Sequence, residues 1–324
     1  MRPLRAVGRR ARRLRAGGAQ GSSGHEARHD AWLKLFDETL GPIEEACADG
    51  QPDSFALFRD LDDDLWALLL TQEFDAYPNI RSRLPDVPDP SLQQLWNGAS
   101  GVALAAQSKA YYAKLRERHG AYSDRPLSQS RVLDFGCGWG RLTRYLARDV
   151  EPGNLYGCDP VELILHVCRD SGVPATLAQS DFVPERLPFE VEFDMAFSFS
   201  VFTHISEAAH ESCLRALHRS LRPGALLSLT VRPTEYLRFS PVMRPALEAL
   251  GPDPSARLAE PRYIFVPHPA EPSHLQYEGG EMTYGETVIT LPYIRERWSP
   301  LFELLAVDVL VGDLYQLMLT LRRR

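Results

Sequence analysis

The chain has 324 residues, of which 44% are hydrophobic and 24% are charged, so it can bury the core of one large domain or two modest ones. Seven Arg and no acidic residue lie in residues 1–24, so the rest of the chain has a net charge of −14, whereas the whole chain has −7. This acidic balance argues against a nucleic-acid-binding body, and no apolar run reaches the roughly 18 residues of a membrane span. We therefore expect neither a nucleic-acid nor a membrane partner.

The Cys residues are five in number and form no C-x-x-C pair. Such usage is typical of reduced thiols in a cytoplasmic protein, and not of a disulfide framework or a zinc site. We expect a cytoplasmic location and no bound metal. No pattern indicates an oligomeric state.

The composition of residues 1–24 predicts a tail outside the folded part of the chain. Residues 1–24 combine the seven Arg with Gly and Ser and show no periodicity. They lack the apolar segment of a secretory signal, so a disordered tail is favoured over a targeting peptide or an anion-binding arm.

Residues 25–99 predict a helical extension. Apolar side chains recur at helical spacing in two sets, from Trp32 to Phe36 and from Phe55 to Leu69, with a break expected at Gly41-Pro42. The stretch 77–90 contains four Pro and predicts an irregular connector.

Residues 100–324 predict one α/β domain. Ser100 is expected to cap a helix that ends near Gly120, after which short apolar strands alternate with helices. This alternation favours a parallel sheet with helices on both faces. Strands are expected at 132–133, 155–158, 175–178, 195–199 and 225–231, and helices over 141–148, 161–170 and from the cap Ser206 through Leu217.

The alternation of strands and helices stops after the fifth strand. Residues 232–284 are rich in Pro, Gly and aromatics, which indicates a cap-like insertion. Two further strands, 302–311 and 315–321, are joined at Gly312-Asp313 and predict an antiparallel hairpin, which a nicotinamide-binding Rossmann domain lacks.

The segment VLDFGCGWGR, residues 132–141, carries the main functional signal. Glycines directly after a strand allow a tight turn and a close approach to a ligand, and the next helix presents unpaired N–H groups to the same place. The dinucleotide fingerprint G-x-G-x-x-G would need glycine at position 141, but the third glycine is Gly140 and residue 141 is Arg. Asp134 stands two residues before the first glycine, and a carboxylate there suits a cation better than a pyrophosphate.

This D-x-G-x-G-x-G run resembles the first motif of class I S-adenosylmethionine-dependent methyltransferases. The resemblance covers residues 130–231 well and the terminal hairpin moderately, and it does not cover residues 1–99 or the insertion. It implies a three-layer, Rossmann-like α/β fold. The expected sheet has seven strands and is mostly parallel with a C-terminal antiparallel hairpin, the helical extension is additional, and S-adenosyl-L-methionine is the implied cofactor.

The resemblance also implies roles for single residues. Asp134 would lie near the cationic methionine end of the cofactor, with Ser198 beside the methionine moiety. Asp159 would accept from the ribose hydroxyls, although it also suits a helix N-cap before Pro160. Asp181 would accept from the adenine amino group, unless it is a solvated loop residue. The full expected cofactor-binding set is Asp134, Gly136, Cys137, Gly138, Gly140, Asp159, Pro160, Asp181, Phe182 and Ser198.

The expected activity is methyl transfer to a small-molecule or glycan acceptor, at a hydroxyl oxygen. Methylation of exocyclic base amines is not expected, because no N-P-P-Y type motif follows the fourth strand. Two alternatives stay open: a non-catalytic module that binds the same cofactor, and a nicotinamide-dependent oxidoreductase.

A hydroxyl acceptor must lose its proton, so a general base is needed. His204, His268, His274 and Tyr284 are candidates, but hydrogen bonding that orders the loop is favoured for His204, and no base is assigned. Aromatic residues of the insertion either line the acceptor site or form the insertion's own core. These aromatic residues are Tyr263, Phe265, Tyr277 and Tyr284.

Overall fold

The computed structural model describes residues 26–49, 55–269, 277–278 and 281–324, so the predicted tail of residues 1–24 lies outside the described part. Seven strands form the central sheet: β1 (Val132–Phe135), β2 (Leu155–Asp159), β3 (Thr176–Gln179), β4 (Phe193–Ser198), β5 (Leu221–Val231), β10 (Phe302–Val309) and β11 (Leu317–Arg323). Their order is β10-β11-β5-β4-β1-β2-β3. β11 is antiparallel to β5 and β10, and the other neighbouring pairs are parallel, which confirms the predicted fold class.

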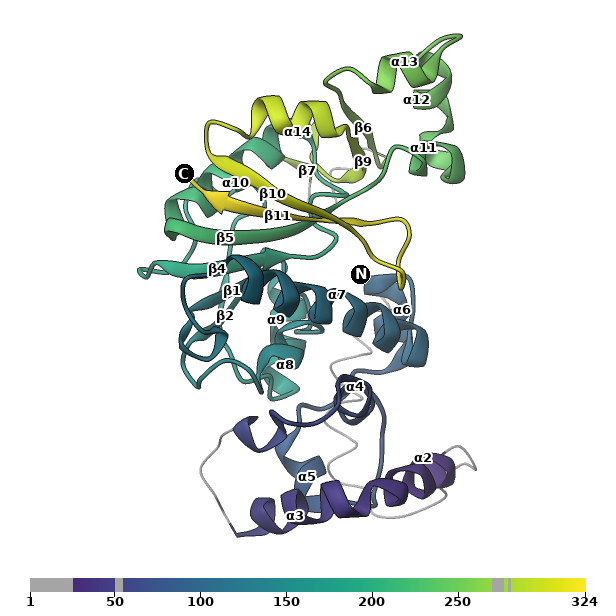
Figure 1. Ribbon diagram of the computed structural model, residues 1–324. Helices are drawn as coiled ribbons and strands as arrows, with labels where there is room; N and C mark the ends of the chain where they lie inside the picture. The colour runs from purple at the N-terminus through teal and green to yellow at the C-terminus, as the bar shows by residue number, and fades with distance from the viewer. Residues whose placement is uncertain (1–25, 50–54, 270–276, 279–280) are drawn as a thin grey trace.

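Helices cover both faces of this sheet (Figure 1). The helices of the α/β part are α7 (Gly101–Tyr122), α8 (Thr143–Leu146), α9 (Glu162–Asp170), α10 (Glu207–Ser220) and α14 (Leu291–Arg297), with the short 3-10 helix η3 (Leu127–Gln129). Successive side chains of a strand point to opposite faces. Accordingly, Phe197 of β4 packs with Tyr111 of α7, whereas Ala196 packs with Leu214 of α10. Ser206 caps α10 as predicted, and its Oγ accepts from the N–H of Ala209.

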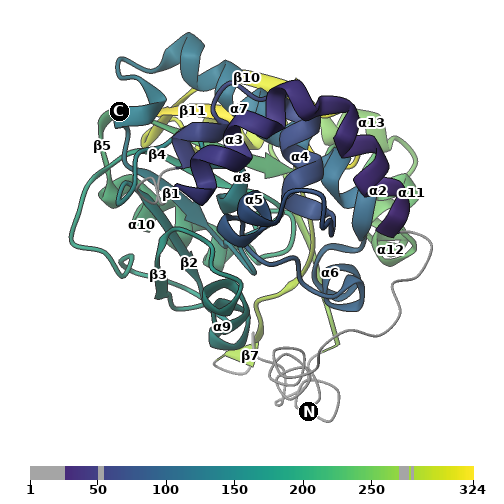
Figure 2. The ribbon, with the colours of Figure 1, turned by 90° about the horizontal axis from the view of Figure 1, so that it is seen from below.

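The N-terminal extension consists of short helices, and seen from below α2–α5 lie in front of the sheet (Figure 2). They are α2 (Glu26–Leu33), η1 (Lys34–Phe36), α3 (Asp37–Ala48), η2 (Phe55–Phe58), α4 (Asp63–Thr71), α5 (Pro78–Arg83) and α6 (Pro90–Asn97). Leu40 and Trp66 share one hydrophobic core with Phe197 of the sheet, so the extension and the α/β part are packed as a unit.

Three predictions for this extension are wrong. α3 continues through Gly41 and Pro42, because a proline removes a single backbone hydrogen bond and the helix buries Leu40 and Cys47 on either side of it. In the first apolar set only Leu33 is buried, whereas Trp32, Leu35 and Phe36 are exposed. The stretch 77–90 contains the helix α5, which begins at Pro78, where the fixed φ of proline suits a first helical turn.

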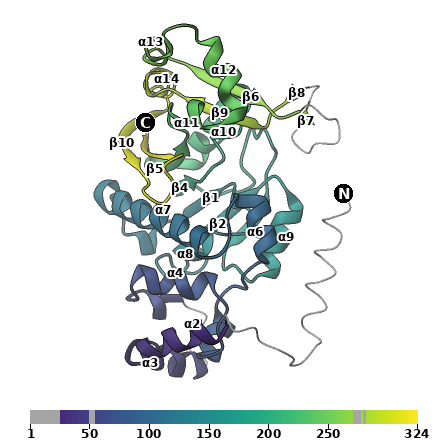
Figure 3. The same ribbon diagram turned by 90° about the vertical axis from the view of Figure 1, so that its right-hand side faces the viewer.

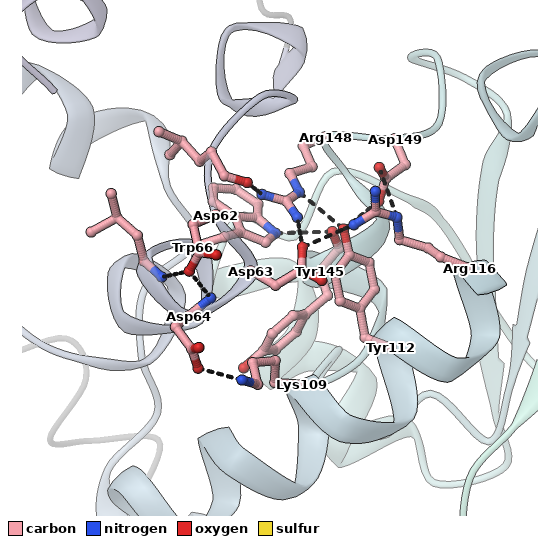
Figure 4. A network of polar contacts seen from close by, with 12 residues as sticks. Asp62, Asp63, Asp64, Trp66, Lys109, Tyr112, Arg116, Tyr145, Arg148 and Asp149 are labelled. Carbon is pink, nitrogen blue, oxygen red and sulfur yellow. Dashed lines mark hydrogen bonds and ion pairs between the residues drawn. The ribbon is translucent and has the colours of Figure 1, made fainter. Parts of the chain in front are cut away.

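A buried cation joins the extension to the α/β part (Figure 4). The guanidinium of Arg148, which follows α8, pairs with Asp63 of α4 and donates 2.7 Å to the carbonyl of Leu61 and 2.9 Å to the hydroxyl of Tyr112. The indole N–H of Trp66 donates to the carbonyl of Tyr145 in α8 at 3.0 Å. These contacts fix α4 against the helix that follows the glycine-rich loop.

The insertion forms a separate lobe at the end opposite α2–α5 (Figure 3). Its elements are α11 (Tyr236–Phe239), η4 (Pro241–Met243), α12 (Arg244–Ala249), α13 (Pro254–Leu258), β6 (Tyr263–Pro267), β7 (Tyr277–Glu278), β8 (Glu281–Met282) and β9 (Gly285–Ile289). β6 pairs antiparallel with β9, which begins directly after the predicted end at residue 284, so the insertion extends beyond its predicted bound. Leu237, Met243 and Val288 form a small core of the lobe's own. No described helix is long and apolar enough to cross a membrane.

Candidate active site

One cavity of about 800 Å³ lies at the carboxyl ends of β1, β2 and β4. Besides the loops after these strands, α6, α7, the insertion and the loop between β10 and β11 contribute to its wall. The structure brings eight of the ten predicted cofactor-binding residues to this wall: Asp134, Gly136, Cys137, Gly138, Asp159, Pro160, Asp181 and Phe182. Gly140 and Ser198 do not line it.

The glycines of the loop after β1 serve different purposes. Gly136 has φ 79°, and a Cβ there would lie 2.3 Å from Cγ2 of Val201. Gly140 has φ 78°, and a Cβ there would lie 2.7 Å from Sγ of Cys168 in α9. Gly140 thus allows close packing between the loop and α9, which explains a glycine away from the cavity.

Asp159 organises the glycine-rich loop from the end of β2. Its Oδ2 accepts 3.0 Å from the N–H of Gly138, and its Oδ1 accepts 2.9 Å from the N–H of Val161. α9 begins at Glu162, so Asp159 is not the cap residue itself, although it orders the turn before the helix. A carboxylate has about four lone-pair sites, so two backbone bonds leave acceptor capacity for hydroxyls in the cavity.

Asp134 is a second buried carboxylate at the same edge of the sheet. It is 2% exposed and accepts 2.6 Å from the hydroxyl of Thr143. Burial raises the pKa of Asp134 to about 7 and that of Asp159 to about 6, since water is withdrawn from the charged forms. Two buried carboxylates with raised pKa values suit a cationic ligand.

The other end of the cavity is aromatic and more open. Asp181 is exposed there, and Phe182 packs against a cluster that contains Trp139. The indole N–H of Trp139 donates 2.8 Å to Asn97 of α6, so the extension closes this end. Ser198 is buried, and its hydroxyl donates 2.8 Å to the carbonyl of Phe135, which joins β4 to β1. The structure therefore gives Ser198 a role within the sheet.

A polar cluster lies where the insertion meets the cavity. Arg232 follows β5, and its guanidinium pairs with Oε2 of Glu286 in β9 at 2.8 Å. The hydroxyl of Tyr236 donates 3.0 Å to the same oxygen, and the guanidinium lies 3.8 Å from the centre of the Tyr236 ring. Oε1 of Glu286 lies 3.8 Å from Nδ1 of His204, which is beyond hydrogen-bond distance.

His204 orders this cluster. Its Nδ1 lies 2.8 Å from the carbonyl of Gly285, and a carbonyl only accepts, so Nδ1 carries the proton. Its Nε2 then accepts from Arg232 at 3.2 Å. Burial lowers the pKa of His204 to about 4, and its one lone pair is occupied, so it is poorly placed to act as a base.

The other predicted base candidates and aromatics divide between two environments. Tyr284 and His268 line the cavity, and the ring of Tyr284 stacks on His204 with centroids 5.1 Å apart. Tyr263 belongs to the core instead, since its ring lies against buried His210 and its hydroxyl donates to the carbonyl of Ile205. His274 lies outside the described residues, as does the side chain of Tyr277.

Comparison with known families decides the nature of this domain. Residues 132–224 match the family model described as "Methyltransferase domain". The chain contains a class I methyltransferase domain. This membership, with the terminal hairpin, sets aside the nicotinamide-dependent oxidoreductase.

The curated relatives match about a third of the chain. A tRNA (carboxymethyluridine(34)-5-O)-methyltransferase of Arabidopsis thaliana is 32% identical over 33% of this chain and 25% of its own length. A ubiquinone biosynthesis O-methyltransferase of Pseudomonas aeruginosa is 32% identical over 34% of this chain and 49% of its own length. The chain therefore spans a quarter to about half of these curated relatives. A solved magnesium protoporphyrin IX methyltransferase from Synechocystis is 15% identical, with a TM-score of 0.46, and covers 82% of this chain and 96% of that chain.

Several residues in the wall of this cavity were not predicted. Trp96 and Asn97 come from α6, which lies beyond the predicted connector of residues 77–90, and Glu286 comes two residues after the expected end of the insertion. Each reaches the cavity through long-range packing that has no local pattern. The described residues contain no cluster of His, Cys, Asp or Glu that could hold a metal ion.

Cofactor affinity should depend on pH through Asp134. A carboxyl with a pKa of about 7 is largely protonated below that pH, and a cationic ammonium group prefers the ionised form. We expect the affinity for S-adenosylhomocysteine to fall as the pH is lowered, approaching about tenfold per pH unit below about pH 7, with a proton released on binding. Calorimetry in buffers of different ionisation enthalpy measures both quantities. The same pH dependence in Asp134→Asn would contradict the assignment.

Proposed function

We propose that this methyltransferase transfers the methyl group of S-adenosyl-L-methionine to a hydroxyl oxygen of a small-molecule or glycan acceptor. The observation that carries the proposal is that one cavity has two buried carboxylates, Asp134 and Asp159, at one end and Glu286 on another side, with an Oε1 that makes no hydrogen bond to the described residues. The first pair suits the cofactor, and Glu286 suits an acceptor that loses a proton.

The two carboxylates at this end of the cavity fit the cofactor. When bound, S-adenosyl-L-methionine supplies a methyl group on a sulfonium that is already a good leaving group. Asp134 would hold the cationic methionine end, and Asp159 would accept from the ribose hydroxyls while it keeps the N–H of Gly138 in place. The protein's contribution is mainly to hold the two reactants close together and in line.

Glu286 is the residue that would take the proton of the acceptor hydroxyl. Arg232 and Tyr236 both bind Oε2 and so fix the carboxylate, whereas Oε1 makes no hydrogen bond within the described part of the chain. The side chain is 14% exposed, so it can be reached from the cavity. A positioned carboxylate can accept a proton from a nearby hydroxyl.

The wall beside this carboxylate favours a ring-containing acceptor. Tyr236, Tyr284, Phe239 and Tyr315 line the cavity, and the rings of Phe239 and Tyr315 lie edge to face at its rim, 5.6 Å apart. Aromatic faces bind sugar or aromatic rings, and the acidic body of the chain supports a small acceptor over a nucleic acid. The names of the two O-methyltransferases above are compatible with a hydroxyl acceptor.

Glu286→Gln should abolish most turnover and spare cofactor binding. The amide keeps the shape of the side chain but cannot take a proton, so we expect kcat to fall by about 10²–10⁴-fold with unchanged affinity for S-adenosylhomocysteine. The measurement uses S-adenosyl-L-methionine with a deuterated methyl group and a panel of phenols and methyl glycosides, with products followed by mass spectrometry. Glu248→Gln, an exposed position on α12, is the matched control.

Two outcomes would count against the proposal. Methylation of amine acceptors and of no hydroxyl acceptor would show that the methylated atom is nitrogen and not oxygen. Binding of S-adenosylhomocysteine with no turnover on the whole panel would favour the non-catalytic module.

A further inference from the structure

The mouth of the cavity is apolar and open to solvent. Phe239 of α11 and Tyr315 of the loop between β10 and β11 line the cavity, yet both are exposed, Phe239 to 65%. Val242 and Leu314, which are next in sequence to residues that line the cavity, are exposed as well, Leu314 to 64%. Single exposed apolar side chains are common, but a group of them around one opening is typical of a binding surface.

Two short segments form this mouth, one from the insertion and one from the terminal hairpin. Residues 239–242 have the sequence FSPV, and residues 310–316 have the sequence LVGDLYQ. The ring centroids of Phe239 and Tyr315 are 5.6 Å apart, and those of Tyr236 and Tyr315 are 5.8 Å apart. The two segments therefore meet at the cavity, although they are far apart in the sequence.

The loop of residues 310–316 is held in this position. A Cβ at Gly312 would lie 3.1 Å from a side-chain carbon of α7, so the loop packs on that helix and lies between it and α11 (Figure 1). Asp313 is the one charged residue of the two segments, and its carboxylate accepts 2.7 Å from the amide of Gln107 and 3.1 Å from the N–H of Tyr315. The exposed apolar side chains of the loop are thus fixed, and its one charge is already hydrogen-bonded.

We propose that the acceptor carries an apolar chain that leaves the cavity past Phe239 and Tyr315, an inference that rests on the proposed function. The chain would lie against Val242 and Leu314, while the hydroxyl that is methylated lies inside, near Glu286. Each methylene group that the mouth covers is removed from water, whereas a charged extension of the acceptor would lose hydration without gaining a partner in either segment. The acceptor is then amphipathic, with a hydroxyl at one end and an alkyl chain at the other.

The test measures the binding of acceptor probes that differ only in chain length. The probes are 4-methylphenol and 4-octylphenol, and methyl and octyl β-glucoside, titrated into the full chain with saturating S-adenosylhomocysteine and below their micelle-forming concentrations. In at least one pair, wild type should bind the octyl probe about 10- to 60-fold more tightly, since covering two or three methylene groups gives about 3- to 4-fold for each. Equal affinity within both pairs would overturn the proposal.

Two variants test whether the mouth causes this preference. Leu314→Asn and Val242→Asn change exposed side chains, so both proteins are expected to fold as wild type does. Each should keep the affinity for the methyl probes and bind the octyl probe about 3- to 10-fold more weakly than wild type. Leu35→Asn, at an exposed position of the N-terminal extension, is the matched control and should keep the full preference. A preference that survives in both variants, or that falls equally in the control, would overturn the proposal.

Sedimentation and turnover distinguish the remaining outcomes. A wild-type dimer that Leu314→Asn dissociates would assign the exposed surface to a second copy of the chain and overturn the proposal. A chain-length preference without methylation of any hydroxyl probe would support the apolar mouth and contradict the proposed function. Methylation of both members of a pair with the same KM would support the proposed function and contradict the apolar chain.

Discussion

Asp159→Ala is expected to weaken binding of S-adenosylhomocysteine by about 1.5–3 kcal/mol for each ribose hydroxyl that loses its acceptor. The carboxylate is 7% exposed, and it also accepts from the N–H of Gly138. Its removal would therefore take away the proposed ribose contacts and release one anchor of the glycine-rich loop. Calorimetric titration of wild type and variant measures the difference directly.

Two companion variants separate these contributions. Asp159→Asn keeps one side-chain oxygen for the loop and should lose less affinity than Asp159→Ala. Asp170→Ala, at the exposed end of α9, is the matched control and should bind as wild type does. Unchanged affinity in a folded Asp159→Ala protein would remove Asp159 from the cofactor site.

Arg148→Met should lower the free energy of unfolding by about 3–5 kcal/mol, the range for breaking a buried ion pair by removing one partner. Arg148 is 1% exposed and holds Asp63, the carbonyl of Leu61 and the hydroxyl of Tyr112 across the boundary between the extension and the α/β part. Methionine fills similar space but leaves the carbonyl of Leu61 without this donor. Urea unfolding gives the free energy.

Arg116 supplies the matched control within the same network (Figure 4). It pairs with Asp63 at 2.8 Å, but its side chain is 36% exposed, so water can replace the lost contact. Arg116→Met should cost about 1 kcal/mol or less. Similar losses for the two variants would show that burial of Arg148 is not what makes its contacts stabilising.

The sheet was largely predictable because its signals are local. The strand predicted at 155–158 is observed as β2 (Leu155–Asp159), and the apolar run at 195–199 lies in β4 and just beyond it. Such strands are buried on both faces, so continuous apolar runs identify them. The glycine-rich loop was equally predictable from the sequence, since positive φ at Gly136 and Gly140 restricts those positions to glycine.

The N-terminal helices were less predictable because tertiary packing decides which of their faces is buried. Trp32 and Leu35 are apolar but exposed, whereas Leu40 is buried beside a Gly-Pro pair that would end most helices. Tertiary packing of this kind overrides helix propensity and the periodicity of apolar residues.

The acceptor side of the cavity was not predictable for a related reason. Glu286 becomes a site residue only because β9 pairs with β6 and brings it to Arg232, which is 54 positions earlier in the chain. The residues expected to bind the cofactor follow the strands, whereas the residues proposed to bind the acceptor depend on the insertion.

Calorimetric titration of the full chain with S-adenosylhomocysteine and, separately, with NADH tests the central claim most directly. The two buried carboxylates and the loop spacing predict saturable binding of one S-adenosylhomocysteine per chain and none of NADH. Binding of NADH without binding of S-adenosylhomocysteine would contradict the account.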